Sequence, residues 1–130
     1  MSKRLNALQR GLDAETLAAR HLEQQGLKLL ERNYRSRFGE IDLIMQHGND
    51  IIFVEVRYRS RRDFGLAGET IDARKRHRLE CTALHYLEQQ RADDCAPRFD
   101  VVLIENQQGD VQMHRAKIEW IKNAFDASIT

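Results

Sequence analysis

The chain has 130 residues with a formal net charge of +1, and 42% of its residues are hydrophobic, with seven glycines but only one proline. This length and composition predict a single compact domain over residues 1–130 and exclude a repeat protein or a low-complexity chain. Residues 1–13 contain no continuous apolar stretch, so we expect neither a signal peptide nor a membrane anchor, and a cytoplasmic location.

The first half of the chain predicts a helix followed by three strands. The helix is expected over residues 5–25 and ends at Gly26, because glycine adopts the left-handed conformation of a helix C-terminus at little cost. Strands are expected over residues 27–34, 38–46 and 51–58. The last two strands form a hairpin.

The second half predicts a helix over residues 71–90, with Thr70 as its N-cap. Two more strands are expected over residues 99–105 and 111–115. Apolar residues at helical spacing predict a short amphipathic helix over residues 118–125. The resulting order, αβββαββα, indicates a mixed α/β layered domain.

A turn at Gly48-Asn49 sets the register of the predicted hairpin. This dipeptide is typical of a type II′ turn with glycine at the first central position. Such a turn makes His47 pair with Asp50, and all other pairs follow by counting outward.

Counting outward places Asp42 opposite Glu55 and Glu40 opposite Arg57, unless a β-bulge shifts the register by one. Opposed residues have Cβ atoms about 4.5 to 5.5 Å apart, a separation at which two carboxylates repel each other. A cation bound between them would remove that repulsion. The alternative is that both acids face solvent on a half-buried sheet. The strands alone leave both interpretations open, because structural ion pairs also perturb carboxylates.

The segment from Arg57 to Arg78 is strongly basic, with eight Arg or Lys residues against three acids, a local charge of +5. Because Arg and Lys neutralise phosphates, this segment beside the two acids predicts a nucleic-acid surface. An ordinary solvated helix face is the alternative. The expected nucleic-acid contacts are Arg59, Arg61, Arg62, Arg74, Lys75 and Arg78.

Glu15 interrupts the apolar stripe that Leu8, Ala18 and Leu22 form on the first predicted helix. One explanation is that the helix begins near Asp13, which would make Glu15 a first-turn acid favoured by the helix dipole. The other is that Glu15 reaches the sheet as part of a site.

A zinc site on the second predicted helix is disfavoured. His77, Cys81 and His85 share one face at i, i+4 and i+8, and both residue types bind zinc. Three ligands over two turns span about 12 Å, so one ion cannot contact all three.

Several blocks of the sequence resemble the YraN family of small bacterial proteins, and the resemblance covers nearly the whole chain. The most specific blocks are GEIDLI at residues 39–44 and FVEVRYR at residues 53–59, with LERNYR at residues 30–35 and RFDVV at residues 98–102 in support. That family resembles the restriction-endonuclease-like (PD-(D/E)XK) superfamily and is related to archaeal Holliday-junction resolvases. The resemblance implies an α/β fold with an αβββαβ core and a mixed central sheet flanked by helices.

The resemblance also implies roles for individual residues. Glu15, Asp42 and Glu55 match the three acidic positions of the nuclease motif, which would hold Mg²⁺ or Mn²⁺, the hard cations that carboxylates bind. Arg57 stands where lysine is usual and completes the implied catalytic set. The implied partner is nucleic acid, and the implied substrate is DNA of branched or otherwise structured form. A homodimer is also implied, because a four-way junction needs two symmetric cuts.

Two functional classes follow, with a third as the alternative to both. The first is a metal-dependent nuclease, and the second is a catalytically inactive nucleic-acid-binding accessory protein in DNA replication or repair. The third is a protein-interaction domain without a nucleic-acid role. Arg57 separates the first two, because a guanidinium can stabilise a charged transition state but cannot act as a base.

Overall fold

The computed structural model describes residues 3–60, 71–92, 96–106 and 116–125. Two helices and five strands occur in these ranges. In chain order they are α1 (Lys3–Gln24), β1 (Lys28–Ser36), β2 (Gly39–His47), β3 (Asp50–Ser60), α2 (Ala73–Gln89), β4 (Arg98–Asn106) and β5 (Lys117–Phe125). No helix in these ranges is long and apolar enough to cross a membrane.

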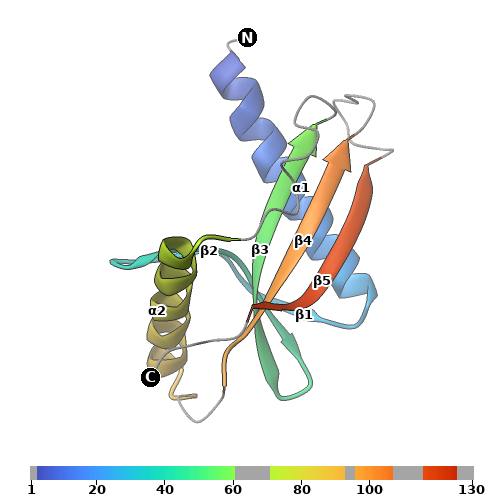
Figure 1. The fold of residues 1–130 in the computed structure, drawn as a ribbon. Coiled ribbons are helices and arrows are strands. Elements are labelled where there is room, and N and C mark those ends of the chain that lie inside the picture. Colours follow the sequence, from blue (N-terminus) through green and yellow to red (C-terminus); the bar gives the residue numbers. More distant parts are fainter. Residues whose placement is uncertain (1–2, 61–70, 93–95, 107–115, 126–130) are drawn as a thin grey trace.

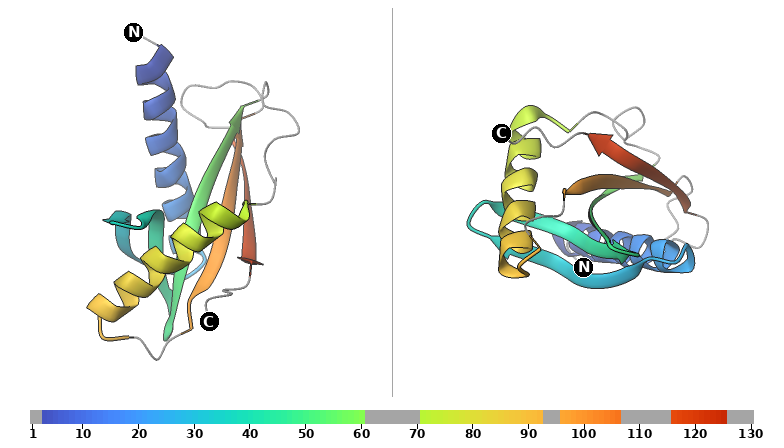
Figure 2. Two further views of the ribbon diagram at one scale, coloured as in Figure 1. Left: turned by 60° about the vertical axis from the view of Figure 1, so that its left-hand side comes forward. Right: turned by 90° about the horizontal axis from the view of Figure 1, so that it is seen from below.

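The five strands form one mixed sheet in the order β1-β2-β3-β4-β5. Neighbouring strands are antiparallel except β3 and β4, which are parallel and joined through α2. A parallel pair requires such a crossover. The two helices lie on opposite faces of the sheet (Figures 1 and 2). The predicted α/β fold with an αβββαβ core is therefore confirmed.

Each helix covers its own hydrophobic cluster. Ala14, Ala18 and Leu22 of α1 pack with one set of strand residues on one face, which we call the α1 cluster. Leu79 and Leu87 of α2 pack with the other set, the α2 cluster. Both sheet faces are thus covered near the middle of β2 and β3, where the strands need apolar residues on both sides.

The predicted hairpin register is confirmed where the strands pair. His47 lies opposite Asp50, and the pairs continue outward to Leu43 opposite Val54. Gly48 has a φ of 62°, whereas Asn49 is not among the residues with positive φ. This combination fits glycine at the first central position of a type II′ turn.

The helix predicted over residues 118–125 is wrong, because this segment is strand β5. Ile118 and Trp120 pack against the α1 cluster, whereas Ile121 and Phe125 pack against the α2 cluster. The spacing of Ile118, Ile121 and Phe125 suits one side of a helix, but as a strand the segment supplies apolar residues to both faces of the sheet. The strand predicted over residues 111–115 lies outside the described residues.

Both helices begin at positions that differ from the predictions. The N-cap of α2 is Asp72, whose side chain accepts a hydrogen bond from the Lys75 amide, so the assignment of Thr70 was wrong. Aspartate is as good a cap as threonine, and the sequence offered both. Helix α1 begins at Lys3, so Glu15 lies within the helix and is not a first-turn acid.

Candidate active site

The site begins where β2 and β3 stop pairing. Beyond Leu43 and Val54 the Asp42 carboxylate accepts the Val56 backbone N–H at 2.8 Å. The alternation of β2 also breaks there, because Ile41 and Ile44 both pack in the α2 cluster although they are three residues apart. Asp42 and Glu55 both line the space where the strands open.

Glu55 faces the opening from β3 and is held by a residue of α2. Lys75 Nζ donates to Glu55 Oε1 at 2.6 Å, and the Glu55 side chain is only 11% exposed. The alternative that these acids simply face solvent is therefore excluded for Glu55. Because the Asp72 cap fixes the first turn of α2, it also fixes the position from which Lys75 reaches the strand.

Burial raises the pKa of Asp42 to about 7. The negative charge of Glu55 is the second cause, and that of Glu15 contributes in the same direction. The Val56 N–H and the Lys75 ammonium lower the pKa but do not offset these effects. Asp42 therefore lies in surroundings that disfavour its charged form.

Glu15 approaches from α1, on the other side of β2. Its Oε1 lies 3.5 Å from Nη2 of Arg32, and this buried oxygen accepts no hydrogen bond within the described parts of the chain. Arg32 in turn donates to the Thr16 hydroxyl at 3.2 Å. The negative charge of Glu15 contributes to the raised pKa of Asp42. No three His, Cys, Asp or Glu side chains in the described ranges are gathered closely enough to hold a metal ion.

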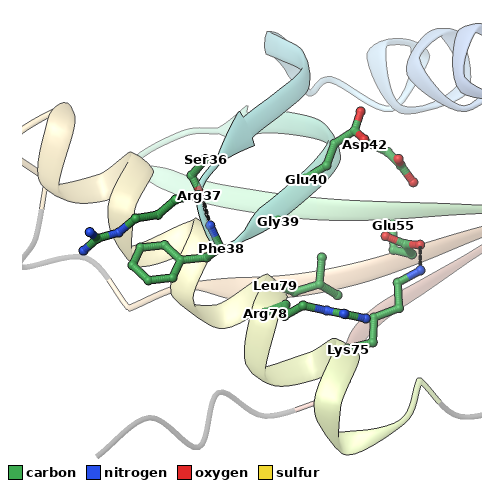
Figure 3. A pocket seen from close by; sticks show the side chains of 10 residues that line it. All are labelled: Ser36, Arg37, Phe38, Gly39, Glu40, Asp42, Glu55, Lys75, Arg78 and Leu79. Atoms are coloured by element: carbon green, nitrogen blue, oxygen red, sulfur yellow. Dashed lines mark hydrogen bonds and ion pairs between the residues drawn. The ribbon is translucent and has the colours of Figure 1, made fainter.

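A pocket of about 490 Å³ joins these groups to the β1–β2 turn. One end holds the acids and Lys75, the opposite end holds the two residues of the turn, and the surface of α2 lies between them (Figure 3). In that order the principal lining residues are Asp42, Glu55, Lys75, Leu79, Arg78, Phe38 and Arg37.

Comparison with known proteins matches residues 14–104 to the uncharacterised protein family UPF0102. The chain belongs to this family. A UPF0102 protein of Dechloromonas aromatica is 52% identical over 118 residues, covering 91% of this chain and 89% of that protein. One from Methylobacillus flagellatus is 49% identical over 119 residues, covering 92% and 98%. One from Pseudomonas paraeruginosa is 44% identical over 128 residues, covering 98% and 100%.

The segment that matches the UPF0102 model contains every site residue predicted from the sequence. It begins one residue before Glu15 and ends within β4. The acids, Arg57 and the lysine that pairs with Glu55 therefore all lie in the part of the chain that defines membership.

The expected nucleic-acid contacts of this UPF0102 protein fall into three groups. Lys75 and Arg78 line the pocket, and Arg74 is exposed on the same helix. Arg59 instead forms an ion pair with Glu105 of the neighbouring strand. Arg61 and Arg62 lie outside the described residues.

Arg57 follows Glu55 by two positions on β3 and is partly buried. Its Nε is a buried donor without a hydrogen-bond partner among the residues the structure describes. Glu40, predicted to lie opposite it, lies beyond the paired part of the ladder and forms an ion pair with Arg35 at 3.6 Å.

Sequence reasoning did not single out Phe38, which lines the pocket from the β1–β2 turn. The available signal was an aromatic residue between Arg37 and Gly39, where a tight turn normally carries polar residues. This signal is weak, because nothing in the sequence shows that the turn lies beside the acids.

The three α2 residues considered as zinc ligands divide between two contacts, one made by His85 and the other between Cys81 and His77. His85 Nδ1 lies 2.7 Å from the Tyr34 hydroxyl of β1, in a hydrogen bond that joins the two elements. Cys81 Sγ lies 3.5 Å from His77 Nε2, one helical turn away. His85 therefore serves to attach α2 to the sheet.

Proposed function

We propose that this protein is a metal-dependent nuclease that hydrolyses phosphodiester bonds in structured or branched DNA. The observation that carries the proposal is the pair of converging acids, Asp42 and Glu55, at the point where β2 and β3 separate. The order of helices and strands, and the positions of the acids on them, support a relationship to the YraN family and to the restriction-endonuclease-like superfamily.

The residues present fit a divalent cation. An ammonium group already contacts Glu55, and the pKa of Asp42 is raised first by burial and then by the negative charge of Glu55, both of which a bound cation would oppose. Asp42 and Glu55 would hold Mg²⁺ or Mn²⁺ directly, with the Val56 carbonyl as a further oxygen ligand. Glu15 has an unsatisfied buried oxygen, but it is not gathered with the two strand acids closely enough to share one ion directly, so it would contribute through a water molecule.

When bound, the ion would supply an activated water molecule and stabilise charge on the phosphate oxygens. The protein supplies the remaining positive charge. Lys75 now contacts Glu55, and if this carboxylate held the ion, the Lys75 ammonium would be available to the substrate phosphate. Arg57 adds a permanent positive charge two residues from Glu55, a role suited to stabilising a charged transition state.

A second function is favoured by Arg57 itself. If the reaction needs a group at this position that gives up a proton, a guanidinium cannot provide it. The protein would then be an inactive nucleic-acid-binding accessory protein that retains the pocket and the basic helix. Metal binding without cleavage is the outcome that identifies this second function.

Calorimetric titration with Mn²⁺ tests the ligand set. We expect the parent protein to bind Mn²⁺ with a Kd in the millimolar range or tighter, and binding to be lost in Asp42→Ala and Glu55→Ala. Lys75→Met removes the competing ammonium and should therefore tighten Mn²⁺ binding while leaving the carboxylates in place. Glu40→Gln is the matched control, because Glu40 also lines the pocket but pairs with Arg35.

A cleavage panel then decides between the two functions. Single-stranded, duplex, flapped and four-way DNA would be incubated with the parent protein and Mg²⁺ or Mn²⁺. Cleavage that disappears in Glu55→Ala establishes the nuclease. Absence of Mn²⁺ binding by the parent protein would refute the metal-dependent mechanism.

A further inference from the structure

Phe38 is a large aromatic residue that belongs to neither hydrophobic cluster. It lies in the turn between β1 and β2 and is only partly buried, and the α2 cluster beneath it does not include it. Its neighbours in the pocket are mostly polar or charged. An aromatic ring kept out of the core and facing a polar pocket suggests contact with a ligand.

The turn that carries Phe38 is tied to α2. The Phe38 amide donates to the Ser36 hydroxyl at 3.1 Å, and that hydroxyl donates to Thr82 Oγ1 at 3.3 Å. Thr82 is buried and donates to the Arg78 carbonyl at 2.8 Å. These bonds hold the backbone that carries Phe38 beside α2 before any ligand binds, which lowers the entropic cost of binding.

The ring already stacks with a planar group. The Arg37 guanidinium lies over the Phe38 ring, with its carbon 4.8 Å from the ring centroid. The His85 ring is edge-on to the Phe38 ring, and the two ring centroids are 6.4 Å apart. A nucleobase is a larger planar group that stacks on aromatic rings in the same way. The volume of about 490 Å³ falls within the about 300–1,000 Å³ typical of ligand pockets.

We propose that Phe38 is a stacking platform for an unpaired nucleobase, so that the pocket takes a strand with at least one single-stranded nucleotide. This inference rests on the proposed function and narrows its substrate class. The backbone of that strand would run along α2 past Arg78 and Lys75 toward Asp42 and Glu55, which lie at the other end of the pocket (Figure 3).

A paired base cannot use this platform. Both of its faces are covered by neighbouring bases in a duplex, and exposing one costs the stacking and pairing energy. An unpaired base in a flap, bulge or junction has a free face. The site therefore discriminates between unpaired and paired bases, and it requires no hydrogen-bond recognition of particular bases.

Binding measured in EDTA tests this platform without interference from cleavage. Anisotropy titrations would compare a short single strand with a duplex hairpin of equal charge, using the parent protein, Phe38→Ala and Phe38→Tyr. We expect Phe38→Ala to weaken single-strand binding about tenfold and duplex binding less than about twofold, and Phe38→Tyr to bind like the parent. Leu84→Ala is the matched control, because Leu84 is an exposed apolar residue of α2 that does not line the pocket.

A second readout uses 2-aminopurine in the single strand, whose fluorescence is quenched when it stacks on an aromatic ring. Quenching by the parent protein and its loss in Phe38→Ala support the proposal. Equal weakening of single-strand and duplex binding, or no quenching by the parent, overturns it even if Phe38→Ala proves unstable. Failure of the cleavage panel with these results intact would refute the nuclease alone, whereas absence of all DNA binding would refute both.

Discussion

Asp42 is held in surroundings that favour the neutral acid. Burial and the charge of Glu55 raise its pKa to about 7, so the folded protein retains a proton that the unfolded chain releases near its ordinary pKa. The stabilising contribution of this proton is fully present at acidic pH and is lost as the pH rises through about 7. A buried carboxylate whose ionisation lowers the stability of the fold near neutral pH is typical of a site that binds a cation.

Replacing Asp42 with asparagine should therefore stabilise the metal-free protein at alkaline pH. The side-chain amide retains an acceptor for the Val56 N–H but carries no charge, so we expect Asp42→Asn to gain about 2 to 3 kcal/mol more at pH 8 than at pH 5. Urea unfolding in EDTA at both pH values measures the difference. Glu40→Gln serves as the control, because Glu40 is exposed on the same strand. Parallel pH profiles for the parent and Asp42→Asn would contradict the assigned pKa.

The position of each acid was predictable to a different extent. The hairpin register follows from a turn only a few residues away and holds as far as Leu43 opposite Val54, but the regular alternation of β2 breaks near Asp42. Glu15 was ambiguous, since the sequence did not show whether α1 began before or after Asp13. Lys75 was assigned to the phosphate, whereas in the structure it pairs with Glu55, a contact across 20 residues of sequence.

Strand β5 is an edge strand, and one buried carboxylate of β4 attaches it to the sheet by side-chain hydrogen bonds. Asp100 of β4 accepts hydrogen bonds from the Arg98 guanidinium, from the Trp120 indole N–H at 2.8 Å and from the backbone N–H of Asn123 at 2.8 Å. Its side chain is completely buried. The same residue therefore joins β5 to β4 at two points, and the backbone of Asn123 adopts a φ of 51° beside it.

Truncating Asp100 should loosen β5 without affecting the pocket that Asp42 and Glu55 line. We expect Asp100→Ala to lower the free energy of unfolding by about 3 kcal/mol, because it leaves the Trp120 and Asn123 donors unsatisfied. Urea unfolding measures this loss, and a red shift of Trp120 fluorescence reports exposure of the chain's only tryptophan. Glu119→Gln, an exposed change on the same strand, should cost less than about 0.5 kcal/mol. Equal effects of the two substitutions would show that Asp100 does not anchor the strand.

The wrong helix prediction for residues 118–125 also arises because contacts with a neighbouring strand decide the structure of this segment. Residues 118–125 satisfy a helical pattern as well as a strand pattern, and short apolar segments do not distinguish the two by periodicity. The presence of Asp100 on a neighbouring strand, together with an open edge beside β4, decides in favour of the strand. Local propensity could not reveal either condition.

Across the whole molecule, the charged side chains are unevenly distributed although the net charge is only +1. Positive side chains of α2 reach the pocket, whereas Arg59 is neutralised by Glu105. Nucleic-acid binding should therefore depend on a few cations of α2, and its dependence on salt reports how many phosphates they neutralise.

Replacing Arg78 should reduce that salt dependence. We expect Arg78→Ala to decrease the slope of log Kobs against log salt concentration for a single strand by about 0.7, the contribution of one phosphate. Anisotropy titrations over a range of salt concentrations measure the slope. Arg35→Ala is the control, because its side chain is 78% exposed but does not line the pocket. An unchanged slope in Arg78→Ala would place the nucleic acid on another surface.

The sequence by itself determined the hairpin register from His47 opposite Asp50 to Leu43 opposite Val54, and the two helices α1 and α2. These features depend on turns and on side-chain periodicity within a few residues of one another. Only the tertiary structure decided that Lys75 neutralises Glu55, that Glu15 approaches from the opposite face, and that Phe38 lines the same pocket. Each of these contacts joins separate elements, and packing of helices against the sheet sets their positions rather than local conformational preference.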